Sequence, residues 1–181
     1  MKLLFLGPPG AGKGTQAERV AKALGLAHVS TGDMFRWHVS EGTPIGVEVQ
    51  AIMRRGDLVP DSMTISMLND HIGLQDASGG YILDGFPRTL RQAEALDAAI
   101  GEDALSAVVV LEAPESELLE RLLARGRADD TEESVRNRLK LYAADTEPLI
   151  EFYEPRGVVK RVEGVGEVEE ITARILGVLN G

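Results

Sequence analysis

Short apolar runs alternate with amphipathic stretches along the chain. After the run at residues 2–6, apolar side chains recur at positions 17, 20, 21 and 24, which is the spacing of one helix face. Strands are predicted at residues 2–6, 27–30, 81–84, 107–111 and 158–162. Because helical stretches separate these runs, the pattern predicts an α/β fold, in which helices cover both faces of a five-stranded parallel sheet. Ligands of such sheets bind at the carboxyl ends of the strands.

Two further helices are predicted between the second strand and a turn at residues 56–60. Helices inserted between strands can form a substrate-binding flap. A charged segment at residues 124–130, ARGRADD, precedes a long helix predicted from residue 131 to 147. We therefore expect one domain, residues 1–181, with a core of 1–29, 60–123 and 131–181, a flap at about 30–59 and a short lid loop at about 124–130.

The segment GPPGAGKGTQ at residues 7–16 joins the first strand to the first helix. Backbone N–H groups in such a glycine-rich turn can bind phosphate oxygens, and Lys13 adds a positive charge. The segment departs from the pattern G-x-x-x-x-G-K-[ST] at one position, because Gly14 precedes Thr15. We predict a phosphate-binding loop, and an ordinary glycine-rich turn is the less favoured alternative.

Composition narrows the possible classes of function. The chain has 181 residues, of which 44% are hydrophobic, enough for one full core. It has no cysteine, which argues against disulfides and thiolate metal sites. Its net charge of −10 argues against a nucleic-acid or anionic-membrane partner. We find no basic leader and no run of 18 apolar residues, so a cytoplasmic protein is expected.

Cationic side chains gather near the predicted loops. They are Lys13, Arg36, Arg88, Arg125, Arg127 and Arg138. About one cation per phosphate suits a nucleoside triphosphate, so six cations favour two phosphorylated substrates in one cleft, as in a kinase. A GTPase is disfavoured because no lysine is followed by x-Asp. Arg138 lies at the edge of an apolar helix stripe and should point inward, where Asp145 or a bound phosphate could pair with it.

Several candidates also have structural explanations. Ser30 with Asp33, and Thr89 with Gln92, have the spacing of a capping box, so Asp33 and Gln92 could serve only their helices. Asp130 could cap the long helix.

Two further residues have alternative roles. Arg125 could interact with the carboxyl end of its own helix. Asp84 ends the third strand beside the phosphate loop, where a carboxylate can hold Mg²⁺ or its waters.

The chain resembles the bacterial adenylate kinases over essentially its whole length. The matching segments are GPPGAGKGTQ at 7–16, STGDMFR at 30–36, GDLVPD at 56–61, ILDGFPRT at 82–89, Gln92, and GRADDT followed by RNRL near 126–139. The resemblance implies the nucleoside monophosphate kinase fold of P-loop NTPases. It also implies reversible transfer of the γ-phosphoryl of MgATP to AMP, giving two ADP without a covalent intermediate and serving purine-nucleotide and energy-charge homeostasis.

The resemblance implies a role for individual residues. For ATP they are Gly10, Ala11, Gly12, Lys13, Gly14, Thr15, Arg125 and the backbone of Gly166. For AMP they are Thr31, Arg36, the backbone of Asp57, Leu58 and Val59, then Gly85, Phe86, Pro87, Arg88, Gln92, Arg127 and Arg138. The implied catalytic residues are Lys13, Arg88, Arg127 and Arg138, while Asp33 and Asp84 would hold Mg²⁺ mainly through water. The family also implies a monomer.

Two departures and two alternatives accompany the resemblance. Many relatives carry a basic residue where this chain has Asp57, and the short lid loop indicates the type without zinc. A UMP/CMP kinase of the same fold is one alternative, although Thr31 and Gln92 favour adenine in the resemblance. A non-catalytic nucleotide-binding regulator is the other, and the cations for two phosphate groups argue against it.

Overall fold

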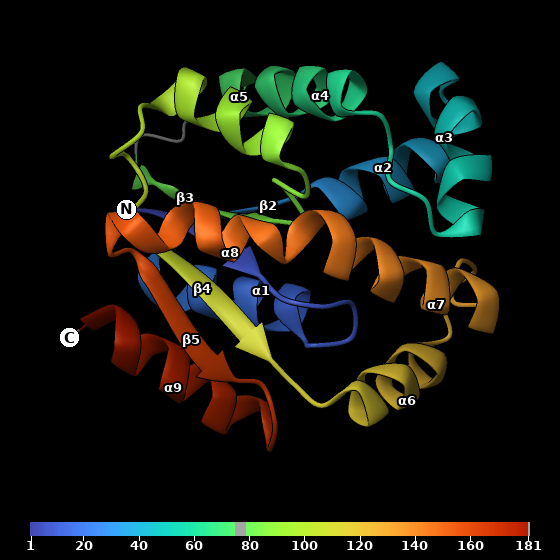
Figure 1. The fold of residues 1–181 in the computed structure, drawn as a ribbon. Helices are drawn as coiled ribbons and strands as arrows, with labels where there is room; N and C mark the ends of the chain where they lie inside the picture. Colours follow the sequence, from blue (N-terminus) through green and yellow to red (C-terminus); the bar gives the residue numbers. More distant parts are fainter. Residues whose placement is uncertain (75–78, 181) are drawn as a thin grey trace.

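The computed structural model describes residues 1–74 and 79–180 (Figure 1). A single five-stranded sheet has the order β2-β3-β1-β4-β5, and every pair of neighbours is parallel. The strands are β1 (Lys2–Leu6), β2 (Ala27–Ser30), β3 (Tyr81–Asp84), β4 (Ala107–Glu112) and β5 (Val159–Glu163). The predicted parallel sheet is confirmed, and the observed strand ends differ from the predicted ones by no more than one residue.

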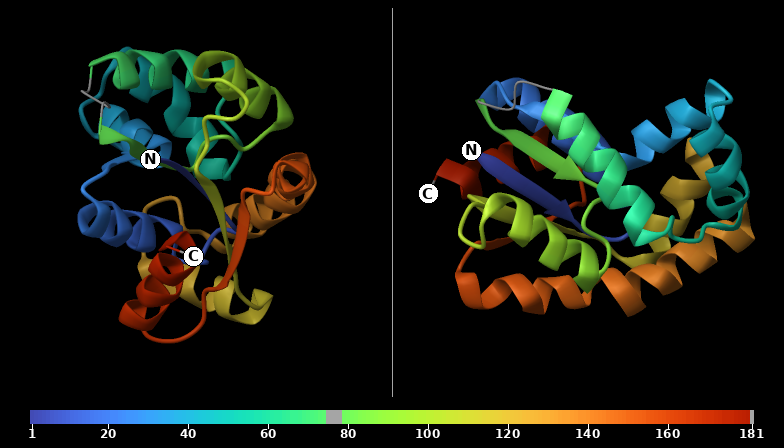
Figure 2. Two further views of the ribbon diagram at one scale, coloured as in Figure 1. Left: turned by 90° about the vertical axis from the view of Figure 1, so that its left-hand side faces the viewer. Right: turned by 90° about the horizontal axis from the view of Figure 1, so that it is seen from above.

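Helices cover both faces of the sheet (Figure 2). They are α1 (Lys13–Leu24), α2 (Thr31–Ser40), α3 (Pro44–Arg55), α4 (Asp61–Leu74), α5 (Leu90–Ile100), α6 (Glu115–Arg125), α7 (Glu132–Leu141), α8 (Pro148–Tyr153) and α9 (Val168–Asn180). In the described part of the chain, none of these helices has the length and apolar character needed to cross a membrane.

Alternation of side chains along the strands builds two hydrophobic layers. Leu4 and Leu6 of β1 point to one face, where they belong to a buried cluster with residues of α4, α5 and α8. Leu3 and Phe5 point to the other face, where they cluster with residues of α1 and α9. Because both faces are covered, the central strands are apolar throughout, as the sequence pattern indicates.

Serine and threonine side chains begin several helices. The hydroxyls of Ser30 and Thr89 accept hydrogen bonds from the N–H groups of Asp33 and Gln92, as the capping-box spacing predicts. The N-cap of α7 is Thr131, which accepts from the N–H of Ser134. The expectation that Asp130 caps this helix is therefore wrong.

A long helical path crosses the molecule from α7 to α8. The two helices are joined by a π-helical segment, Tyr142–Thr146, after which Pro148 stands in the first turn of α8. The hydroxyl of Thr146 donates to the carbonyl of Arg88 at 2.8 Å. The helix predicted over residues 131–147 thus ends in a π segment that contacts the β3–α5 loop.

Helices α2 and α3 lie at the end of the molecule away from both termini (Figure 2). Phe35 and Val49 form a small buried cluster with Met67 of α4. Gly56 ends α3 with φ of 75°, and a Cβ atom there would collide with the carbonyl of Ser134 in α7. The chain that leaves α3 therefore packs directly on α7.

One buried ion pair joins α5 to the segment after α8, and it can be tested by mutation. Arg156 donates to both carboxylate oxygens of Asp97, at 3.0 and 2.6 Å, and Asp97 is 8% exposed. We expect Arg156→Ala to lower the free energy of unfolding by about 3 kcal/mol, because Asp97 would keep a buried charge without its partner. Urea denaturation measures this loss.

Arg136→Ala is the matched control for this prediction. Arg136 pairs with Glu132 on the surface, where both side chains are 66% exposed, so its loss should cost less than about 0.5 kcal/mol. Equal losses in the two variants would contradict a stabilising role for the Arg156–Asp97 pair.

Candidate functional site

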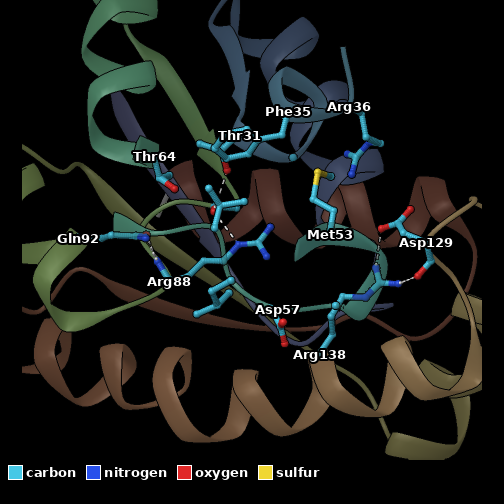
Figure 3. A pocket seen from close by; sticks show the side chains of 15 residues that line it. Thr31, Phe35, Arg36, Met53, Asp57, Thr64, Arg88, Gln92, Asp129 and Arg138 are labelled. Atoms are coloured by element: carbon cyan, nitrogen blue, oxygen red, sulfur yellow. Dashed lines mark hydrogen bonds and ion pairs between the residues drawn. The ribbon is translucent and has the colours of Figure 1, made fainter. Parts of the chain in front are cut away.

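A cleft opens at the carboxyl ends of the strands. A smaller pocket adjoins this cleft, and Figure 3 shows the side chains that line the pocket. The phosphate loop, the β3–α5 loop and residues of α6 and α7 line the cleft. The smaller pocket lies between α2, the chain after α3, α4 and the β3–α5 loop. Arg36, Arg88 and Arg138 line both spaces, so the two meet at a group of cations.

The phosphate loop follows β1 and begins the cleft wall. Gly10 has φ of 89°, and a Cβ atom there would lie 2.7 Å from the carbonyl oxygen of Leu118, so the loop packs too closely for a side chain. Lys13 Nζ donates to the carbonyls of Gly7 and Pro8, at 2.6 and 2.9 Å. Burial lowers the pKa of Lys13 to about 8, so its ammonium group is still mostly protonated at pH 7.

The predicted ATP-site residues do not all face the cleft. Those that line it are Gly10, Gly12, Lys13, Gly14, Thr15 and Arg125. The side chain of Ala11 is buried, and its N–H donates to the carbonyl of Pro8 at 3.1 Å. Gly166, in the loop before α9, is not among the residues that line the two spaces in the described part of the chain. Contacts from Ala11 and Gly166 to a nucleotide stay predictions.

Asp84 stands beside the phosphate loop because β3 pairs with β1. It is 9% exposed, and a Cβ atom at Gly14 would lie 3.3 Å from its Oδ2. His28 of β2 lies with Nε2 3.6 Å from the same oxygen, and the adjoining Asp84 carboxylate raises the pKa of His28. The structure thus confirms that a carboxylate adjoins the loop.

The acidic residues of the cleft suit magnesium bound mainly through water. Asp33 and Asp84 both line the cleft. Within residues 1–74 and 79–180, no group of three histidine, cysteine or acidic side chains could hold a metal ion. Mg²⁺ commonly uses one or two carboxylates together with substrate phosphates and water, so this donor set fits the ion. Asp33 also pairs with Arg36.

Asp130 joins two of the cleft arginines. Its carboxylate accepts from Arg125 at 2.7 and 2.8 Å and from Arg138 at 2.8 Å. Although burial acts to raise it, the hydrogen bonds from Arg125 and Arg138 lower the pKa of Asp130 to about 2. Arg138 also pairs with Asp129 at 3.4 Å. Arg138 therefore points inward as predicted.

The partners of these arginines differ from one expectation. The proposed pairing of Arg138 with Asp145 is wrong, because its partners are Asp129 and Asp130 in the loop before α7. Arg125 stands in the last turn of α6, where its charge favours the carboxyl end of the helix, and it also pairs with Asp130. These contacts draw the two arginines toward one acidic loop.

Arg88 and Arg127 complete the cationic lining. Arg88 Nε donates to the carbonyl of Gly85 at 2.8 Å, and Thr31 Oγ1 donates to the same oxygen at 2.9 Å. Burial lowers the pKa of Arg88, and the nearby Arg36 and Arg138 act in the same direction. Burial and then Arg36 lower the pKa of Arg127. The arginines therefore converge closely enough to repel one another, an arrangement that favours a bound polyanion.

The smaller pocket combines polar and apolar side chains. It contains most of the residues predicted for AMP, namely Thr31, Arg36, Asp57, Leu58, Val59, Gly85, Arg88, Gln92 and Arg138. Pro87 and Arg127 line the larger cleft, whereas Phe86 is buried in the core. The carboxylate of Asp57 accepts from Arg55 at 2.7 Å and from Asn137 of α7 at 2.8 Å. That side chain is therefore engaged in joining the chain after α3 to α7.

Comparison with known proteins assigns the chain to a family. A family model described as adenylate kinase matches residues 5–158. The chain belongs to the adenylate kinase family. It is 51% identical to an adenylate kinase of Micrococcus luteus, over 97% of this chain and 88% of the relative. It is also 51% identical to adenylate kinases of a Synechococcus species, over 98% of each chain, and of Thermus thermophilus, over 98% of this chain and 96% of the relative.

Four side chains that line the smaller pocket of this adenylate kinase family member were not predicted from the sequence. Phe35, Met53, Thr64 and Asp129 all line the smaller pocket. In the sequence, Phe35 and Met53 cannot be distinguished from other apolar helix residues, and Thr64 belongs to no motif. Asp129 stands next to Asp130 in the matching segment GRADDT, so a pairing of this acidic segment with nearby arginines is the signal that could have found it.

The acidic partner of Arg125 and Arg138 predicts a pH dependence of stability. The folded-state pKa of Asp130, about 2, lies below the ordinary 3.8, so the unfolded chain binds more protons between these values. The carboxylate therefore stabilises the fold above about pH 4, and this contribution is lost as the pH falls toward 2. We expect Asp130→Asn to lower the free energy of unfolding by about 1 kcal/mol at pH 6, allowing for solvent screening of the loop.

Urea denaturation of both proteins between pH 6 and pH 3 tests this expectation. The difference between wild type and Asp130→Asn should shrink as the pH falls. A difference that does not change with pH would contradict the assigned role of the Asp130 charge.

Proposed function

We propose that the chain catalyses reversible transfer of the γ-phosphoryl of MgATP to AMP, giving two ADP. One observation carries this proposal: the cleft and the smaller pocket meet at Arg36, Arg88 and Arg138. The phosphate loop lines the cleft and not the smaller pocket. Such a site can bring phosphates of two nucleotides together. Membership of the adenylate kinase family supports the same reaction.

In the proposed donor site, the loop from Gly10 to Thr15 binds the ATP phosphates. Lys13 would leave its contacts with the Gly7 and Pro8 carbonyls and neutralise charge on the β- and γ-phosphates. Arg125 contacts ATP from the end of α6, and Gly166 contacts the adenine through its backbone. The family resemblance supports these last two assignments.

In the proposed acceptor site, AMP occupies the smaller pocket. Thr31, Gln92 and the chain from Asp57 to Val59 surround its nucleoside, and Arg36 and Arg88 bind its phosphate. Arg127 and Arg138 stabilise the transferring phosphoryl, whose charge spreads over equatorial oxygens as an acceptor oxygen attacks in line. The phosphoryl passes directly between the nucleotides.

Mg²⁺ completes the proposed chemistry. When bound, it would offset the negative charge of the phosphates. Asp84 and Asp33 would hold its water ligands from the end of β3 and the start of α2. His28, which lies beside Asp84, would keep that carboxylate at the cleft.

The flap at residues 30–59 and the loop at about 124–130 are proposed to close over the nucleotides. Closure would exclude water, which otherwise competes as the phosphoryl acceptor. A monomer acting in the cytoplasm is the setting that we propose from the family resemblance.

An acceptor screen tests the proposed reaction. The purified protein is mixed with MgATP and with AMP, CMP, UMP or GMP separately, and the nucleoside diphosphate formed is measured. AMP should be turned over far faster than the other three. A pyrimidine preference would indicate a UMP/CMP kinase on the same fold, and ATP binding without any turnover would indicate a regulator.

Arg88 provides a sharper test of the cationic group. Arg88→Ala should reduce kcat/KM for AMP by about 100-fold or more, because it removes a charge that both ligand spaces share. Steady-state assays at saturating MgATP measure the change. Arg91→Ala is the matched control, since Arg91 is exposed on α5 and should tolerate the change. Near-normal kcat/KM for Arg88→Ala would remove Arg88 from the proposed mechanism.

A further inference from the structure

Asp61, the first residue of α4, lies outside the acceptor pocket and holds a residue that lines it. Its Oδ1 accepts a hydrogen bond from Gln92 Nε2 at 2.7 Å. The same oxygen accepts from Thr89 Oγ1 at 3.1 Å. We propose that Asp61 is a positioning residue that fixes the orientation of the Gln92 amide and thereby selects the acceptor base. This inference rests on the proposed function.

Two partners of opposite character hold the Gln92 side chain. The N–H of Arg88 donates to Oε1 at 2.8 Å, whereas Asp61 accepts from Nε2 on the other side. An ionised carboxylate can only accept, and a backbone N–H can only donate. Rotating the amide by 180° would therefore place oxygen against oxygen and N–H against N–H. Asp61 and Arg88 together allow one orientation.

Burial makes a wrong orientation of the Gln92 amide costly in free energy. Gln92 is 2% exposed, so water offers little compensation for an amide in the wrong orientation. Its backbone is also held, because its N–H donates to the hydroxyl of Thr89 at 3.2 Å. Thr89 and Asp61 are themselves hydrogen-bonded, so the first residues of α4 and α5 form one connected group around the amide.

The held amide keeps one free N–H and one free lone pair for a ligand. The free N–H can donate to a ring nitrogen, and the free lone pair can accept from the amino group beside it. Adenine presents this pair of groups on one edge. Guanine presents the reverse order, with an N–H beside a carbonyl oxygen. A flipped amide would suit guanine instead, so the carboxylate behind the pocket discriminates between two purines that it does not touch.

Cytosine shares the adenine order of acceptor and amino donor, so Asp61 should not discriminate against it. Discrimination against cytosine must come from the size of the pocket. The informative comparison for Asp61 is therefore AMP against GMP, since these nucleotides are of similar size and differ in the order of their hydrogen-bonding groups.

Kinetics of three variants test the proposal. For Asp61→Ala, we expect KM for AMP to rise about tenfold with kcat changed less than about threefold, and the AMP-to-GMP ratio of kcat/KM to fall about tenfold. Asp61→Asn can still offer an oxygen to Nε2 and should recover most of the ratio. Glu115→Ala is the matched control, because it removes an exposed first-turn carboxylate from α6 and should leave the ratio unchanged.

A spectroscopic measurement separates this inference from the proposed reaction. In ¹⁵N-labelled wild-type protein without nucleotide, one Gln92 side-chain amide proton should exchange slowly with solvent, and Gln92→Met assigns the signal. Slow exchange should be lost in Asp61→Ala and retained in Glu115→Ala. This readout needs no catalysis, so it decides the role of Asp61 even if the wild-type protein fails to phosphorylate AMP.

Two results would overturn the inference. One is an unchanged AMP-to-GMP ratio in folded Asp61→Ala, even if kcat falls, because a purely structural role would lower activity without altering selectivity. The other is fast exchange of both Gln92 amide protons in the wild-type protein. The second result applies even if Asp61→Ala does not fold.

Discussion

The pairing of β1 with β3 is the constraint on which the cleft depends. Their register places Phe5 beside Asp84, so the phosphate loop and the β3–α5 loop leave the sheet next to one another. A shift of one residue would turn Leu4 and Leu6 from one hydrophobic layer into the other. Because both layers are buried, the core fixes the distance between Lys13 and the acidic residue opposite it before any nucleotide binds.

Around this fixed edge, the charges are arranged in local groups. The chain as a whole carries a net charge of −10, yet three arginines line both ligand spaces. Asp130 offsets the charges of Arg125 and Arg138, and Asp33 that of Arg36. A positive site can therefore exist in an acidic protein, because Arg36, Arg125 and Arg138 each pair with a nearby carboxylate.

Periodicity and motifs predicted the sheet, the helices and the phosphate loop, because these depend on neighbouring residues. They did not reveal the partners of Arg138, since Asp129, Asp130 and Asp145 all stand within reach along the chain. Only the turn of the chain between α6 and α7 selects the first two.

Residues that act across the fold were equally hard to predict. Asp61 belongs to the matching segment GDLVPD, but its contact with Gln92 joins residues that are 31 positions apart. The N-cap of α7 is a similar case: Asp130 was the expected residue, yet Thr131 caps the helix, and either side chain can accept the required bond. Tertiary contacts decide such cases, and the spacing of residues along a single sequence does not show which distant residues meet in the fold.

Asp130 holds two arginines of the cleft at once, and this would affect how a charged ligand binds there. A polyanion that reached Arg125 and Arg138 would not meet bare cations, because both already donate to the Asp130 carboxylate. If the polyanion displaced that carboxylate, binding would be an exchange of partners, and its strength would be the difference between two sets of ion pairs. Asp130 would take both arginines back when the polyanion left. An arginine-rich cleft of this kind would hold a highly charged molecule less tightly than bare cations would.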